Sequence, residues 1–163
     1  MGILEFLEQT ALATFIRESS SYLGFPTFLF MHTLGLSLVV GANAIVALRV
    51  MGFAPGIPLK PLVRLFPFMW VGFILTVISG AGLAIATATS KLTNPILLAK
   101  LVLIVFAGAF MWSLEKKIFR DPGASKNPGL QEGKALSAAL LILWLVVTLM
   151  GRLIAYSSTI FGT

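Results

Sequence analysis

The stretch Leu65–Ser90, LFPFMWVGFILTVISGAGLAIATATS, contains no charged residue. A helix of roughly 20 apolar residues crosses a hydrocarbon core about 30 Å thick, so this stretch is long enough to span a membrane. Three other stretches share this character: Ser19–Leu48 has no charged residue, Pro95–Leu114 has Lys100 alone and Ala135–Tyr156 has Arg152 alone. The sequence therefore predicts four transmembrane helices.

The composition agrees with a chain that is surrounded by lipid. Hydrophobic residues make up 58% of the 163 residues and charged residues 11%, whereas soluble domains contain about 25% charged residues. Four spans leave room only for short loops, so we expect one all-α domain over residues 1–163, an integral membrane four-helix bundle. The chain has no cysteine, which excludes a disulfide, a thiolate metal site and a thiol nucleophile.

The expected helix boundaries follow from apolar periodicity and turn residues. Apolar residues at helical spacing, interrupted by Glu5 and Glu8, predict a short interfacial helix at about 3–18. The spans are expected at about 24–48, 66–88, 95–119 and 135–157. Asn94 suits the N-cap of the third span, with Pro95 in the first helical position. The polar segment 120–133, with turn signals at 121–123 and 127–129, is expected to be a loop.

Basic residues gather in the loops that join the first span to the second and the third to the fourth. These loops hold eight of the 12 basic residues: Arg49, Lys60, Arg64, Lys116, Lys117, Arg120, Lys126 and Lys134. The positive-inside rule places them in the cytoplasm, so both termini are expected outside. The net charge of +6 then reflects topology and anionic lipid. The expected partner is the lipid bilayer, with no role in nucleic-acid binding.

Small residues predict where the helices approach one another. They are Gly35 in the first span, Gly80, Ala84 and Ala88 at four-residue intervals in the second, and Ala107, Gly108 and Ala109 in the third. Small side chains let helix backbones pack closely in lipid. The alternative is that a glycine here leaves space for a flat cofactor.

The only histidine and both intramembrane cations are expected at a similar depth, in the outer half of the bundle. His32 lies roughly 9–12 Å below the outer surface at 1.5 Å per residue, and Lys100 and Arg152 lie near the outer ends of their spans. Their convergence predicts a polar pocket formed by three spans. The alternatives are that both cations extend to the headgroups, and that His32 only hydrogen-bonds a neighbouring helix.

Helical spacing extends this pocket along two helices. His32 and Asn43 lie near one face of the first span, and Thr148, Arg152 and Tyr156 follow at four-residue intervals in the fourth. We therefore expect polar side chains to face the interior of the bundle.

The candidate ligand-binding residues are His32, Lys100, Arg152, Tyr156 and Met150. A neutral imidazole ligates haem iron or a metal ion. The two cations, with Tyr156, are candidates for holding haem propionates or another anion. Met150 is a candidate soft ligand for Cu(I) beside His32. A quinone headgroup is a third candidate ligand.

Several kinds of chemistry have no support in the sequence. The four apolar stretches contain no acidic residue, and a second histidine is missing, which excludes bis-histidine haem ligation within one chain. There is no nucleotide-binding, serine-elbow or zinc-protease motif. We do not expect an enzyme acting by itself.

Three segments carry a resemblance to a known family. They are His32-Thr-Leu-Gly35-Leu-Ser-Leu-Val-Val-Gly41, the pair Ser79-Gly80, and Asn94-Pro95-Ile-Leu-Leu-Ala-Lys100-Leu. They resemble the first span, the small-residue segment and the lysine-leucine helix start of bacterial copper-resistance D-type (CopD-like) membrane domains. This resemblance implies copper handling in the bacterial inner (cytoplasmic) membrane. Together with the positive-inside rule, this location places both termini in the periplasm.

A related group resembles the chain more closely. It consists of uncharacterised four-helix bacterial membrane proteins related to the same domain. Their first loop is similar to Ala47-Leu48-Arg49-Val50-Met51-Gly52, which keeps the arginine and the glycine and lacks their aspartate. The resemblance covers about 24–109.

Two classes of function remain open. The first is a ligand-binding or transport-related membrane protein with copper or haem at the outer pocket. The second is a non-catalytic accessory subunit of a larger respiratory or photosynthetic membrane complex. Association with other membrane subunits, or into a homo-oligomer, is compatible with both.

Overall fold

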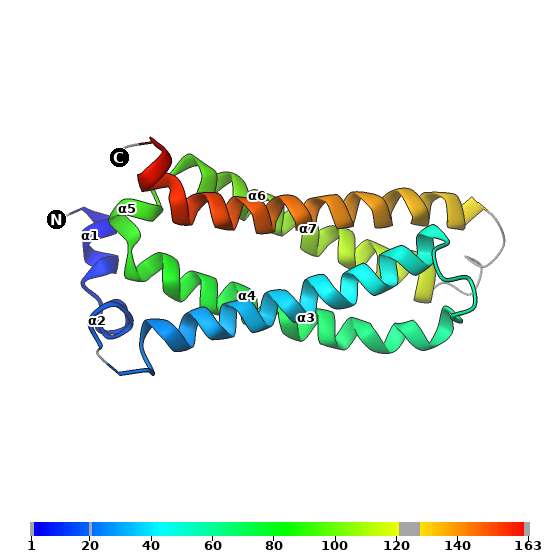
Figure 1. Cartoon of the computed structure of the whole chain (residues 1–163), viewed down its shortest axis with the longest axis horizontal. Helices are drawn as coiled ribbons and strands as arrows, with labels where there is room; N and C mark the ends of the chain where they lie inside the picture. The colour runs from blue at the N-terminus through cyan, green and yellow to red at the C-terminus, as the bar shows by residue number, and fades with distance from the viewer. Residues whose placement is uncertain (1, 20, 121–127, 162–163) are drawn as a thin grey trace.

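Four long helices run side by side along the long axis of the molecule (Figure 1). The computed structural model describes residues 2–19, 21–120 and 128–161, without the side chains of 118–120, 128–132 and 155–161. The long helices are α3 (Phe25–Met51), α4 (Leu65–Ala86), α6 (Pro95–Leu114) and α7 (Pro128–Phe161). The described residues form helices, turns and loops without a strand. The predicted all-α four-helix bundle is confirmed.

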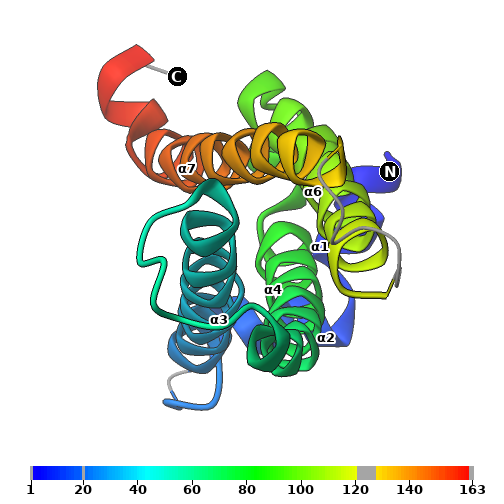
Figure 2. The same ribbon diagram turned by 90° about the vertical axis from the view of Figure 1, so that its right-hand side faces the viewer.

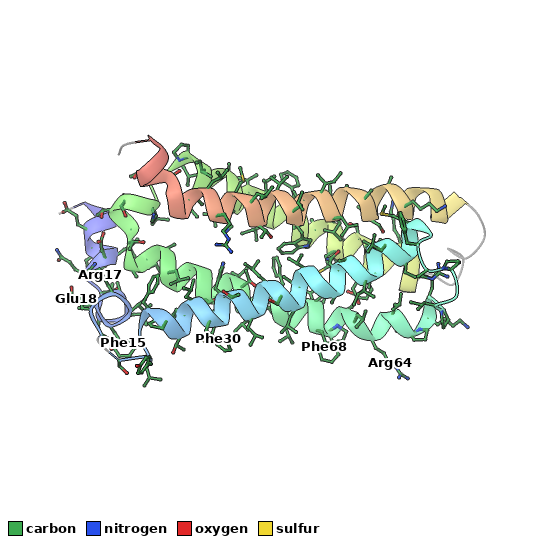
Figure 3. All side chains as sticks on the ribbon, in the orientation of Figure 1. Phe15, Arg17, Glu18, Phe30, Arg64 and Phe68 are labelled. Atoms are coloured by element: carbon green, nitrogen blue, oxygen red, sulfur yellow. The ribbon has the colours of Figure 1, made fainter. Side chains whose placement is uncertain are left out.

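Four helical segments are long and apolar enough to cross a membrane: Phe25–Met51, Lys60–Ala86, Pro95–Lys117 and Gly133–Ile154. Large apolar side chains point outward along them, as the labelled Phe30 and Phe68 show in Figure 3. Phe30 is 66% exposed and Phe68 59% exposed. Such a surface is stable in lipid and would be an extensive apolar patch in water. The chain is therefore a multi-pass membrane protein.

Local sequence explains where the long helices begin and end. Asn94 caps α6 as predicted, because its Oδ1 accepts a hydrogen bond from the Ile96 backbone N–H at 2.9 Å, and Pro95 is the first helical residue. α3 ends at Gly52, whose φ of 104° is accessible to glycine at little cost. Arg49 then donates hydrogen bonds to the carbonyl oxygens of Pro55 and Ile57 and so holds the following loop.

The second and fourth spans differ in detail from the predicted boundaries. The 3₁₀ helix η1 (Lys60–Arg64) leads into α4, and a break at Thr87 separates α4 from α5 (Ala88–Lys91). α7 begins at Pro128 rather than near residue 135, since proline is well suited to a first helical turn. Residues 128–133 of the expected loop are therefore helical, and α6 continues into the π-helix η2 (Glu115–Arg120). Residues 121–127 lie outside the described part of the chain.

The predicted interfacial helix at 3–18 is two helices, α1 (Ile3–Glu8) and α2 (Ala11–Glu18). The chain turns at Thr10, whose side-chain oxygen accepts a hydrogen bond from the Ala13 backbone N–H at 3.4 Å and caps α2. Ala13 and Ile16 are completely buried, because α2 packs against α4. This pair of helices therefore covers one end of the bundle.

The four long helices pack side by side in the order α4, α3, α7 and α6. The most extensive contact joins α3 to α4, and α7 packs against both α3 and α6 (Figure 2). The two ends of the bundle differ. α1, α2 and α5 lie at one end, which we call the terminal end, and the C-terminal part of α7 reaches the same end (Figure 1). η1 and η2 contact each other at the opposite end, the loop end.

The apolar core fills the middle of the bundle and the half toward the loop end. Its buried members include Val46, Phe66, Met111 and Trp144, one from each long helix. Phe73 packs edge-on against Trp144, with ring centroids 6.4 Å apart. The half toward the terminal end holds His32, Lys100 and several small residues instead.

Candidate functional site

His32 faces the neighbouring helix α4. Its Nδ1 lies 3.0 Å from the backbone oxygen of Thr76 and 3.2 Å from Oγ of Ser79. The ring is half-buried, and Asn43 on the same face of α3 is completely buried. The polar face predicted on α3 therefore points into the bundle.

Gly80 provides the space that the imidazole occupies. A Cβ atom at this position would lie 2.9 Å from Cε1 of His32 and 3.3 Å from Nδ1, which is closer than packed atoms approach. The sequence analysis expected Gly80 to bring helices together. In the structure its missing side chain accommodates the flat ring of His32.

The backbones of α3 and α4 touch one turn further into the membrane. A Cβ on Gly35 would lie 2.8 Å from the backbone nitrogen of Thr76, and a Cβ on Gly72 would lie 2.7 Å from the backbone nitrogen of Val39. This close contact holds α3 and α4 in register, so that His32 lies opposite Thr76, Ser79 and Gly80. Gly35 was predicted as a contact residue. Gly72 was missed, although it lies two helical turns before Gly80.

Lys100 extends from α6 toward α7 and is half-buried. Its Nζ would be 3.0 Å from a Cβ placed on Gly151, so the ammonium group lies directly over that glycine. His32 thus lies against α4 and Lys100 against α7. Their predicted approach to one another stays a prediction.

The other predicted ligand residues are placed differently. Arg152 is exposed, and no hydrogen bond or ion pair joins it to a side chain in the part of the chain that the structure describes. Met150 is half-buried beside Gly151. The side chain of Tyr156 lies outside the described residues. Of the predicted residues whose side chains are described, His32, Lys100 and Met150 are therefore half-buried, whereas Arg152 is exposed.

Several polar side-chain atoms are buried inside the bundle. Both amide atoms of Asn43, Oγ1 of Thr76 and Nε1 of Trp144 are buried and have no hydrogen-bond partner among the described residues. Unpaired polar atoms are costly in an apolar interior. Only Asn43 was identified from the sequence, because threonine and tryptophan are common in transmembrane helices without special roles.

A buried carboxylate lies at the loop end, far along the bundle from His32. Glu115 is 7% exposed, and its Oε2 accepts a hydrogen bond from Nε1 of Trp70 at 3.1 Å. The predicted third span, 95–119, includes Glu115, but acidic residues were considered only over the apolar stretch that ends at Leu114. In the structure η2 follows α6 directly, and the Glu115 side chain is buried within the bundle.

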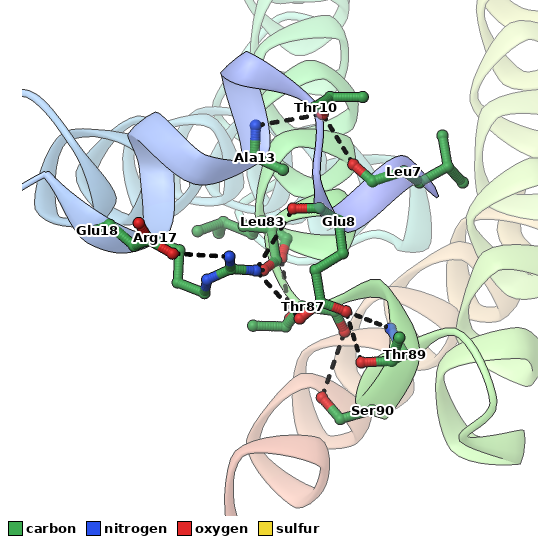
Figure 4. Close-up of polar contacts among 11 residues, drawn as sticks. Leu7, Glu8, Thr10, Ala13, Arg17, Glu18, Leu83, Thr87, Thr89 and Ser90 are labelled. Atoms are coloured by element: carbon green, nitrogen blue, oxygen red, sulfur yellow. Dashed lines mark hydrogen bonds and ion pairs between the residues drawn. The ribbon is translucent and has the colours of Figure 1, made fainter. Parts of the chain in front are cut away.

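A polar network attaches α1 and α2 to the terminal end of the bundle (Figure 4). The Glu8 carboxylate accepts hydrogen bonds from the hydroxyl and the backbone N–H of Thr89. Arg17 pairs with Glu8 at 3.1 Å and donates to the last carbonyl of α4, that of Ala86, at 3.4 Å. The hydroxyl and then the backbone N–H of Thr89 hold the pKa of Glu8 below its ordinary value.

The described side chains contain no group of three or more histidine, cysteine, aspartate or glutamate residues that could hold a metal ion. Comparison with protein-family models, curated proteins and solved structures found no match for this chain. The relationship to CopD-like domains therefore stays a prediction from the motifs around His32, Ser79 and Lys100.

Proposed function

We propose that the chain is a ligand-binding membrane protein whose His32–Lys100 site holds an anionic cofactor, with haem as the best candidate. The observation that carries the proposal is the position of Lys100. Its ammonium group lies over Gly151 on a half-buried side chain, in the same half of the bundle as His32. No carboxylate pairs with it in the described part of the chain, and an unpaired cation inside a bundle favours an anionic ligand.

The residues present suit haem better than a bare copper ion. His32 offers one imidazole ligand to iron, and Lys100 offers a charge-assisted contact to a propionate. A bound haem would supply one-electron chemistry. Cu(I) prefers several soft ligands, whereas here a cation lies beside the only imidazole. Lys100 would repel a bare copper ion, so we do not retain copper as the preferred ligand.

The orientation in the membrane follows from the charges. η1 and η2, which carry Lys60, Arg64, Lys116 and Lys117 in or near them, lie at the same end of the bundle. We propose that this end faces the cytoplasm and that both termini face the periplasm of a bacterium. The His32–Lys100 site then lies in the outer half of the inner membrane.

The absorption spectrum and metal content of protein extracted in mild detergent test the proposal. We expect a haem spectrum with iron bound in the wild type, and His32→Ala should abolish both while the helical content is unchanged. Thr33→Ala is a matched control, since Thr33 is exposed next to His32 and its hydroxyl bonds only within α3. Protein that binds neither endogenous nor added haemin would overturn the haem proposal. Instability without other subunits would then favour the accessory-subunit function.

A further inference from the structure

The contacts of His32 determine which of its ring nitrogens carries the proton. The backbone oxygen of Thr76 can only accept a hydrogen bond, and it lies 3.0 Å from Nδ1. Nδ1 must therefore be the donor. The Ser79 hydroxyl donates to the Leu75 carbonyl at 2.6 Å, which leaves the oxygen of Ser79 free to accept a second bond from the same Nδ1–H at 3.2 Å.

The opposite ring nitrogen is left with its lone pair. In a neutral imidazole with a proton on Nδ1, Nε2 is an acceptor and a metal ligand, and it points away from the Nδ1–H bond. That bond is directed at α4, so Nε2 is directed away from α4. No described residue donates a hydrogen bond to Nε2. A histidine that donates its other N–H to a carbonyl is the arrangement that orients imidazole ligands in metal sites.

We propose that Ser79, together with the Thr76 carbonyl, is a positioning residue that holds His32 as the Nδ1–H tautomer, with Nε2 as the ligand-binding atom of the site. The ligand then presents an electron-pair acceptor, such as a haem iron, to Nε2 and an anionic oxygen to Lys100. The role of Nε2 as a ligand-binding atom rests on the proposed function. The assignment of the tautomer rests only on the contacts of Nδ1 with Thr76 and Ser79.

Gly80 is the second component of this arrangement. Because a Cβ at position 80 would lie 2.9 Å from Cε1 and 3.3 Å from Nδ1 of His32, a side chain there forces the ring or the helix to shift, and we expect the shift to weaken the bond to the Thr76 oxygen. Gly80→Ala therefore disturbs the tautomer without removing any hydrogen-bonding group. Ser79→Ala removes one acceptor and leaves the space unchanged. The two variants affect the same nitrogen by different means.

The tautomer can be measured directly because the chain has one histidine. Protein labelled with ¹⁵N-histidine in lipid nanodiscs gives the signals of His32 alone, and two-bond ¹H–¹⁵N correlations distinguish the protonated nitrogen from the unprotonated one. We expect Nδ1 protonated and Nε2 unprotonated at neutral pH in the cofactor-free wild type. An Nε2–H tautomer or an imidazolium there would overturn the proposal, and this result needs no variant to fold.

The variants test the role of Ser79 itself. We expect Ser79→Ala and Gly80→Ala to give a mixture of tautomers, together with a shifted absorption band of any bound haem. Ser113→Ala is the matched control, since Ser113 also donates to the carbonyl four residues earlier, at 2.8 Å, but on α6. Identical ¹⁵N signals in the wild type and in both site variants would exclude a positioning role.

The inference and the proposed function can fail separately. If the wild type shows the Nδ1–H tautomer, the site variants alter it and no haemin binds, the haem proposal fails and the positioning role of Ser79 stands. If haemin binds in a His32-dependent manner while Nε2 carries the proton in the free protein, haem binding stands and the positioning role fails.

Discussion

Lys100 and Arg152 show how the same charge at a similar depth has different surroundings. Lys100 is half-buried with its ammonium group over Gly151, whereas Arg152, the next residue after that glycine, is exposed. One residue turns a helix by about 100°, so depth along a span does not decide which way a side chain points. That direction depends on the face of the helix to which the residue belongs, and the packing of the helix determines which face is turned toward the interior.

This difference predicts unequal effects on cofactor binding. Lys100→Met should weaken haemin binding by about 10- to 150-fold, the equivalent of the roughly 1.5–3 kcal/mol expected for a charge-assisted hydrogen bond. Arg152→Met should change the affinity little, because the structure shows no contact between Arg152 and the site. Haemin titration of both variants in detergent measures this. Equal losses in the two variants would place Arg152 in the site as well.

At the scale of the helices, the contact between α3 and α4 depends on glycine. Gly72→Ala would place a methyl group 2.7 Å from the backbone nitrogen of Val39, so the helices must separate. We expect a lower thermal unfolding temperature and a disturbed His32 environment. Gly41→Ala is the control on α3, since its Cβ would have no neighbour within 4 Å, and it should be neutral or slightly stabilising. Similar melting temperatures for the two variants would contradict a close backbone contact.

The attachment of α1 and α2 should depend on pH. The pKa of Glu8 is held below its ordinary value in the folded state, so the carboxylate stabilises the attachment at neutral pH. This contribution is lost as the pH falls through the lowered pKa. Hydrogen exchange of the α1 and α2 amides should accelerate on acidification in the wild type. Glu8→Gln should exchange fast at both pH values, whereas Glu5→Gln, whose carboxylate bonds only to Gly2, should behave as the wild type.

For the whole molecule, the orientation in the membrane is open to a simple measurement. The chain has no cysteine, so single cysteines at Lys60, Lys116 and Thr93 report their own exposure. We expect a membrane-impermeant maleimide added to intact spheroplasts to label position 93 alone, with positions 60 and 116 reacting only after the membrane is permeabilised. Labelling of 60 and 116 from outside would invert the proposed topology.

Much of the fold could be predicted because a helix that crosses a lipid bilayer needs a long apolar stretch with few charges. The length of the charge-free stretches predicted the four spans. The distribution of basic residues predicted that the two basic loops lie at the same end of the bundle. The partners of His32 could not be predicted in the same way, since Thr76 and Ser79 are more than 40 residues away in the chain and lie among other small residues. Glu115 lies within the predicted third span, but its burial against Trp70 depends on packing between helices, which hydropathy does not report.

The close contact between α3 and α4 also has a consequence for the order of events during synthesis. A ribosome makes His32 first, then the glycines and Ser79 of α4, and only later Lys100 and Gly151. The groups that set the protonation of the imidazole are thus complete once the first two spans have been inserted as a hairpin. The cation is added by the second pair of helices, so a cofactor that needs both can be captured only near the end of biogenesis.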